Sequence, residues 1–367
     1  MNVKRVLIVD DSLVVRETLS SIVSQHPDLS VIGLAENPFE AAKFIKKEVP
    51  DVILLDIEMP RMDGITFLKR LMSQRPVPVV ICSSLVGQGS RASLEALEAG
   101  AVELIKKPVI STKEYLEESK IRIQDVVLAA AKVKLNPVGS APKSPPAPTP
   151  PSSSKSSPIR GRKSAQNVDL IAIGASTGGT DALKTVLSQL PTDFPPIVIV
   201  QHMPEHFTAA FANRLDAECR IRVVEGENDM ALERGMAVIA PGNKHMSVAG
   251  APRSLRVEVR EGPLVSRHRP SVDVLFRSAA ARTKGTAIGV LLTGMGSDGA
   301  TGLLDLRKGG AFTIGQNQQT CTVYGMSRAA LEKGAVEVEL ALNDIPQALV
   351  ELCSKKPAAG SPARVRS

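Results

Sequence analysis

The amino-acid sequence predicts two α/β units, each built on a parallel sheet with helices on both faces, separated by a long linker. Continuous Val/Ile/Leu runs alternate with amphipathic helical patterns on both sides of a segment dominated by Pro, Ser and Ala. Such alternation is typical of buried parallel sheets. A length of 367 residues also exceeds what one compact core normally serves.

Composition places the boundaries between these units. We expect a folded unit over residues 1–125, a helix end and Pro/Ser-rich linker over 126–166, a second folded unit over 167–353 and a disordered tail over 354–367. In doubly wound sheets, functional groups gather at the carboxyl ends of the strands. The candidate strands, whose carboxyl ends are the expected places for functional residues, are RVLIVD, SVIGLAE, VILLDI, PVVICSS and VELIKKP before the linker, and DLIAIGAS, PIVIVQH and AIGVLLTG after it.

Charge and cysteine usage exclude several classes of protein. The net charge is +7, but residues 135–167 carry five basic and no acidic side chains and the tail carries four more, so both folded units are close to neutral. A basic face for nucleic acid is therefore not expected. No apolar run reaches the length of a membrane span, the N-terminus does not resemble a secretory signal, and the four cysteines form no CxxC pair. We expect a cytoplasmic protein without membrane insertion, disulfides or structural zinc.

The first unit carries charged and hydroxyl side chains at its strand ends. Asp10 and Asp11 follow the first strand, Asp56 the third, Ser83 the fourth and Lys107 the fifth. Taken singly, a strand-end aspartate is often a helix N-cap. Clustered together, three carboxylates require a cation, and oxygen ligands favour Mg²⁺. Asp56 could then attack a phosphoryl group, with Lys107 and Ser83 binding the phosphate oxygens.

This pattern resembles the receiver domains of response regulators over about the first 125 residues, which implies a flavodoxin-like (CheY-like) fold. The resemblance implies phosphorylation of Asp56 and Mg²⁺ binding by Asp10, Asp11, Asp56 and the backbone carbonyl of Glu58. One departure is Leu104, which stands where many receivers carry a switching aromatic residue. The signal is therefore expected to be relayed by somewhat different packing.

In the second unit, the sequence Gly174-Ala-Ser176-Thr-Gly178-Gly179 follows an apolar strand and leads into a helix. Such a turn can cradle a phosphate through its backbone N–H groups, although the spacing is neither GxGxxG nor GxxxxGK[ST]. It can equally be a nucleophile elbow that exposes a serine at the head of a helix. The motif alone leaves both interpretations open.

Two further strand ends favour the nucleophile. His202 follows the next strand and is placed to act as a general base, and Asp298 follows a third strand-like run. With Ser176 they make up a serine, histidine and carboxylate triad. The alternatives are a metal pair of His202 and His206, although no HExxH pattern is present, and an ordinary Asp-Gly turn at Asp298. Backbone N–H groups near Met295 are candidate oxyanion donors, and His245 and His268 could line a groove.

The motifs GASTGG, QHMP, APGNKHM, HRPSVDVLF, LLTGMGSDGA and TCTVYGM occur in the order typical of chemotaxis protein-glutamate methylesterases, the CheB family. The resemblance covers about residues 168–350 and implies a doubly wound methylesterase domain. It implies hydrolysis of glutamate methyl esters on cytoplasmic chemoreceptor helices, deamidation of particular glutamines, no cofactor for the esterase, and phosphorylation by a chemotaxis histidine kinase. Ser327 stands where the family commonly has proline, which affects the expected shape of the groove.

Two other classes of output domain are alternatives to an enzyme. A transcriptional module would require a recognition helix with a basic face, and no such pattern occurs. A nucleotide-binding module would use the Gly-rich turn but leave His202 and Asp298 without a role. A response regulator with hydrolase output accounts for both groups of residues.

The linker composition gives a direct prediction. Limited proteolysis should cut first between Asn136 and Lys163, because a Pro/Ser-rich segment without large apolar residues offers an accessible backbone. Mass spectrometry should then find two stable fragments that join in this interval. A first cut inside either α/β unit would show that the boundaries are misplaced.

Overall fold

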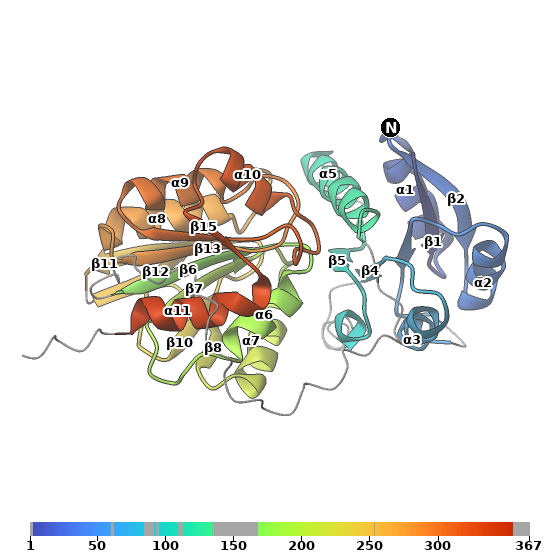
Figure 1. The fold of residues 1–367 in the computed structure, drawn as a ribbon. Coiled ribbons are helices and arrows are strands. Elements are labelled where there is room, and N and C mark those ends of the chain that lie inside the picture. The colour runs from blue at the N-terminus through green and yellow to red at the C-terminus, as the bar shows by residue number, and fades with distance from the viewer. Residues whose placement is uncertain are drawn as a thin grey trace, which may run out of the picture.

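A computed structural model describes residues 3–59, 62–83, 92, 95–108, 113–133, 135, 168–252 and 254–354, the side chains of residues 113–118 excepted. Two α/β units lie side by side, each with a sheet between helices (Figure 1). Most of the proposed linker and tail lie outside the described residues, so the expected disorder there remains a prediction. Within the described part, no helix is both long and apolar enough to cross a bilayer.

The first unit contains a five-stranded parallel sheet in the order β2-β1-β3-β4-β5. This is the flavodoxin-like order that the resemblance to receiver domains implied, with its switch point between β1 and β3. Capping residues fix the helix starts: Asn37 accepts hydrogen bonds from Phe39 and Glu40 N–H groups, and Asp63 accepts one from Thr66. The elements are β1 (Lys4–Val9), α1 (Leu13–Ser24), β2 (Leu29–Ala35), α2 (Pro38–Lys47), β3 (Val52–Leu55), α3 (Gly64–Gln74), β4 (Val79–Ser83), β5 (Glu103–Lys106) and α5 (Lys113–Ala130).

The second unit is organised around a seven-stranded parallel sheet in the order β15-β14-β13-β6-β7-β10-β8. Its central strands are buried along their whole length, which explains their continuous apolar sequences. The elements are β6 (Leu170–Ala175), α6 (Gly179–Leu187), β7 (Ile197–Gln201), α7 (Phe207–Glu218), β8 (Arg222–Glu225), β10 (Met236–Ile239), α8 (Val272–Thr283), β13 (Ala287–Leu291), α9 (Ala300–Lys308), β14 (Phe312–Gln316), α10 (Met326–Glu332), β15 (Val338–Leu340), a 3₁₀ turn (Leu342–Asp344) and α11 (Ile345–Cys353).

A small antiparallel sheet interrupts this pattern between β10 and α8. It consists of β9 (Met230–Ala231), β11 (His245–Ala251) and β12 (Ser254–Arg260). β11 packs against α8, and its core residues join the cluster beneath the main sheet. The insertion matters for function because the chain that leaves it, residues 261–271, runs over the carboxyl edge of the main sheet.

The first unit meets the second through β5 and α5, the elements nearest the larger sheet in Figure 1. Ion pairs join Arg214 on α7 to Glu98 at 2.6 Å and Arg267 to Asp125 on α5 at 3.7 Å. Met295 of the second unit packs against an apolar cluster of the first. The contact therefore covers the carboxyl edge of the seven-stranded sheet.

Candidate functional site

Three neighbouring strands of the larger sheet place Ser176, His202 and Asp298 at one edge. Ser176 follows β6, His202 follows β7, and Asp298 lies in the loop between β13 and α9. All three are buried, with Ser176 the most accessible at 8%. After β6, the strands β7, β8 and β10 lie on one side of it and β13, β14 and β15 on the other. The carboxyl edge between β6 and β13 is therefore the topological switch point of the sheet.

Asp298 receives five hydrogen bonds. Its carboxylate accepts from His202 Nε2 at 2.8 Å and Ser271 Oγ at 2.8 Å, and from the backbone N–H groups of Val272, Asp273 and Gly299 at 2.7–3.1 Å. Val272 and Asp273 open helix α8, so the carboxylate sits at that helix's positive end. Burial disfavours the charged form, but the bond from His202 and then its charge outweigh this, and the pKa of Asp298 is lowered. The carboxylate is thus held ionised and fixed in direction.

His202 is oriented from two sides. Nε2 meets Asp298, and the ring stacks on His268 with centroids 3.7 Å apart and planes within 9°. Burial, and next the nearby His202, lower the pKa of His268, so this second ring stays neutral. No described residue hydrogen-bonds the buried Nδ1 of His202. Ser176 Oγ is among the groups that do not bond this nitrogen, so the structure joins His202 to Asp298 but does not hydrogen-bond it to Ser176.

The backbone around Ser176 is tightly constrained. Its N–H donates to Thr293 O at 3.0 Å, and its carbonyl accepts from Gln201 Nε2 at 3.0 Å. Gly178 has φ 75° before α6 begins, a conformation that favours glycine. A Cβ on Gly294 would lie 2.7 Å from Cβ of Ser176, so glycine is needed there for space. The turn thus presents the serine at the head of a helix.

Other residues singled out in the sequence fall around this centre. Met295 lines the same cavity as Ser176, whereas His206 is exposed at the N-cap of α7. Among the described residues, the three aspartates of the first unit form the only group of three or more candidate metal ligands, and neither His202 nor His206 belongs to such a group. Ser327 is buried and donates to the carbonyls of Leu291 and Leu292, tying α10 to the end of β13.

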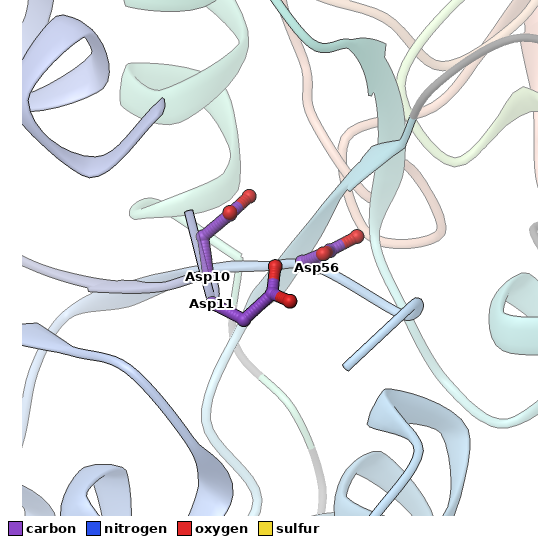
Figure 2. Close-up of side chains that lie close together, drawn as sticks. All are labelled: Asp10, Asp11 and Asp56. Carbon is purple, nitrogen blue, oxygen red and sulfur yellow. The ribbon is translucent and has the colours of Figure 1, made fainter. Parts of the chain in front are cut away.

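The carboxyl edge of the smaller sheet brings Asp10, Asp11 and Asp56 together (Figure 2). One carboxylate oxygen from each lies within 4.8 Å of the others, and Lys107 Nζ is 2.9 Å from Asp10 and 2.7 Å from Asp56. Burial raises the pKa of Asp56 to about 6, while Lys107 opposes this shift. Ser83 is buried at the end of β4, and its carbonyl accepts from Lys107 N–H at 3.0 Å.

A cavity of about 680 Å³ lies between the two units, directly over the serine. The second unit contributes Ser176, Thr177, His202, Leu264, Ser266, Arg267, His268, Met295, Gly296 and Ser297; the first contributes Glu103, Leu104, Ile121, Arg122, Asp125 and Val126. Glu103 is buried, and its carboxylate hydrogen-bonds the side chain of Thr177, next to the candidate nucleophile. Leu104, at the position of the switching aromatic, is also buried here.

The sequence patterns did not reveal the parts played by His268, Ser271, Glu103 and Arg267. The sequence predicts only that His268 could line a groove, and the residue does line the cavity. The signals that could have pointed to Ser271 and His268 are their positions inside HRPSVDVLF, just ahead of α8. Nothing local in the sequence links Glu103 to Thr177, because the contact joins two separate units.

Fold and site together define a class of protein: a response-regulator receiver joined to an α/β unit with a serine–histidine–aspartate arrangement. Family models agree, since residues 6–119 match the response regulator receiver domain and residues 171–349 match CheB methylesterase. The chain belongs to the CheB family of protein-glutamate methylesterases/protein-glutamine glutaminases, as its relatives of similar length show.

Three comparisons illustrate the relationship. A protein-glutamate methylesterase/protein-glutamine glutaminase 2 of Oleidesulfovibrio alaskensis is 51% identical over 95% of this chain and 98% of its own length. A Geobacter metallireducens relative, protein-glutamate methylesterase/protein-glutamine glutaminase 3, is 49% identical over 95% and 99%. The crystal structure of the Thermotoga maritima CheB methylesterase catalytic domain is 35% identical, covers 50% of this chain and 98% of that chain, and has a TM-score of 0.49.

The geometry predicts selective labelling of one serine. A fluorophosphonate should modify Ser176 if Ser176 is the nucleophile of a triad with His202, whose ring Asp298 orients. Mass spectrometry of the digested protein should place the adduct there and find none in Ser176→Ala. Labelling elsewhere at the same rate in Ser176→Ala would contradict the assignment.

Proposed function

We propose that this chain hydrolyses glutamate γ-methyl esters on chemoreceptors through Ser176, His202 and Asp298, and that phosphorylation of Asp56 activates it. The observation that carries the proposal is the 2.8 Å bond between His202 Nε2 and a buried, five-fold hydrogen-bonded Asp298, one strand away from Ser176. Membership of the CheB family supports the type of reaction.

The chemistry follows the serine triad. His202 Nδ1 takes the proton of Ser176 as its Oγ attacks the ester carbonyl, and the imidazolium then protonates the departing methoxide to give methanol. Asp298 keeps the tautomer with hydrogen on Nε2 and stabilises the imidazolium. Water, activated in the same way, releases the glutamate carboxylate and restores the serine. Backbone N–H groups near Met295 stabilise the oxyanion in this proposal.

The same acyl-enzyme accounts for a glutaminase activity. An amide of glutamine gives the same glutamyl–serine ester when ammonia leaves in place of methanol, and water completes the deamidation. The relatives' names combine the two activities in one protein. No additional group is required, because His202 protonates either leaving group.

In the first unit, we assign phosphorylation to Asp56, with a chemotaxis histidine kinase as phosphodonor. Asp10, Asp11 and Asp56 fit a hard divalent cation, because one carboxylate oxygen of each lies within 4.8 Å of the others. Two of these side chains are buried and one is exposed. Asp10, Asp11, Asp56 and the Glu58 carbonyl would hold Mg²⁺, which neutralises phosphoryl oxygens during transfer. Lys107 and Ser83 then bind the phosphate.

Regulation follows from the position of the receiver. Glu103, Leu104 and Asp125 form one wall of the cavity over Ser176, so a substrate segment must displace them. A tether between the units keeps their contact populated even if it is weak. Phosphorylation adds about −1.5 to −2 charges at the aspartate cluster, and rearrangement of Ser83 and Lys107 would alter the adjoining β4 and β5. The active arrangement is one in which this contact opens.

The test is methanol release from methylated receptor-containing membranes. Wild-type protein should release methanol faster with acetyl phosphate and Mg²⁺, Ser176→Ala should release almost none in either condition, and Asp56→Asn should keep the basal rate without the increase. Ser188→Ala, which alters a half-buried serine at the C-cap of α6, is a matched control. Wild-type rates in Ser176→Ala would exclude the assigned nucleophile.

Glu103 gives the domain contact a dependence on pH. Burial raises its pKa from 4.5 to about 7, although bonds and charges from Leu104, Arg122 and Thr177 oppose the shift. Opening returns the pKa towards 4.5, so the closed form holds a proton between these values. Closure is therefore most favourable at low pH, weakens as pH rises to about 7, and changes little above it.

The comparison with Glu103→Gln isolates the effect of Glu103 on domain closure. Any titration of the catalytic centre affects the rates of both proteins alike and cancels in their ratio. The ratio of basal methanol release, wild type over Glu103→Gln, should rise between pH 5 and 7 and then level off. A ratio that stays constant over this interval would show that Glu103 does not titrate with domain opening.

A further inference from the structure

The turn formed by Val265, Ser266, Arg267 and His268 projects a cation over the catalytic cavity. Val265 N–H donates to His268 O at 3.1 Å and His268 N–H donates to Val265 O at 2.9 Å, which closes a two-residue hairpin. Ser266 has φ 53° and Arg267 has φ 66°. Positive φ at both central residues is the signature of a type I′ turn, where Asn and Gly are the usual residues.

Ser266 and Arg267 are not residues that readily adopt positive φ. Contacts with neighbouring residues therefore hold the turn in this conformation. Ser266 Oγ donates to Asp273 Oδ2 at 3.2 Å, and His268 is stacked on His202. Arg269 is fixed by Asn243 Oδ1 and by the Gly262 carbonyl. Strained backbone that persists in this way is concentrated at functional sites.

Arg267 is distinguished by its charge. Apart from the two stacked histidines, it is the only ionisable side chain among the described residues that the second unit contributes to the cavity over Ser176. Its side chain is 71% exposed, and it lies one residue from His268 in the chain. A glutamate ester is neutral, so the reaction itself gives this cation nothing to bind.

The residue that faces Arg267 is a carboxylate of the receiver. Asp125 Oδ2 is 3.7 Å from Arg267 Nη1, and Asp125 lines the same cavity. The space beside Arg267 therefore accommodates a carboxylate that another protein surface, here the receiver, brings to it. The receiver supplies it in the closed arrangement, where substrate is kept out.

We propose that Arg267 is a specificity-determining residue that binds a free carboxylate close to the esterified glutamate on the substrate, and that Asp125 takes the place of this carboxylate when the receiver covers the site. The substrate class is thus a polypeptide in which an Asp or Glu lies beside the ester. This inference rests on the esterase function proposed above and adds a second recognition point to it.

The test uses two synthetic peptides with one γ-methyl glutamate each, flanked by aspartate in one and by asparagine in the other. Methanol release is measured with the full-length chain, acetyl phosphate and Mg²⁺. Wild type should prefer the aspartate peptide, and Arg267→Gln should raise its KM about fivefold and abolish the preference. Arg267→Lys should retain part of it. Neither replacement is β-branched, so the strain of the turn is unchanged.

Arg256→Gln is the matched control. Arg256→Gln removes the same charge as Arg267→Gln. Arg256 lies on β12, pairs with Asp229 at 2.7 Å and is not among the residues that line the cavity. This variant should keep the wild-type preference. Equal loss of preference in both variants, or none in Arg267→Gln, would overturn the proposal. If wild type releases methanol from neither peptide, the esterase assignment itself fails, and this inference fails with it.

Asp125→Asn gives an independent readout. Without phosphodonor, Asp125→Asn should lower KM for both peptides by the same factor, because each peptide binds only after the receiver has moved away. In an Arg267→Gln background the same change should leave both KM values unchanged, because the cation that pairs with Asp125 is gone. A fall in KM that persists in that background would contradict the role of Asp125 as a substitute for the substrate carboxylate at Arg267.

Discussion

The second unit depends on one buried carboxylate. Asp298 accepts hydrogen bonds from His202, from Ser271 and from three backbone N–H groups, two of which open helix α8. An unpaired charge at this depth would be strongly unfavourable, and these donors offset the loss of water. The same bonds connect β7, α8 and the loop before α9. The local stability of this edge and the orientation of His202, the proposed general base, therefore both depend on one carboxylate.

In both units the candidate functional residues lie at the carboxyl edge of the sheet, but the two edges carry different side chains. The smaller sheet gathers three aspartates and a lysine, which suit phosphoryl transfer. The larger sheet presents a serine and a histidine beneath a neutral, stacked ring. The receiver covers the second edge with Glu103 and Asp125, each opposite a residue beside the catalytic centre. In the proposed regulation, charge added at the first edge by phosphorylation opens the contact that covers the second edge.

How far the sequence could predict this structure depended on the range of each interaction. Strand runs and strand-end residues such as Asp56 and His202 are local patterns, and the order of strands follows from rules for parallel sheets. The stacking of His268 on His202 and the bond from Ser271 to Asp298 arise from an irregular segment that crosses the sheet edge. The small antiparallel sheet that delivers this segment was not predicted, because β11 and β12 follow no βαβ alternation. The contacts of Glu103 and Arg267 require knowing how two units meet.

The most direct test of the account is the turnover of Asp298→Asn on methylated receptors, measured together with its thermal unfolding. Asparagine retains one oxygen for Ser271, Asp273 and Gly299, which all donate to Oδ1 of Asp298. The N–H of Val272 and the ring of His202, which bond Oδ2, lose their acceptor, so His202 is no longer fixed in the productive tautomer. We expect a folded protein whose kcat falls by about 10⁴-fold, with KM little changed. A kcat close to that of wild type in a folded Asp298→Asn protein would contradict the claim that this carboxylate orients the catalytic base.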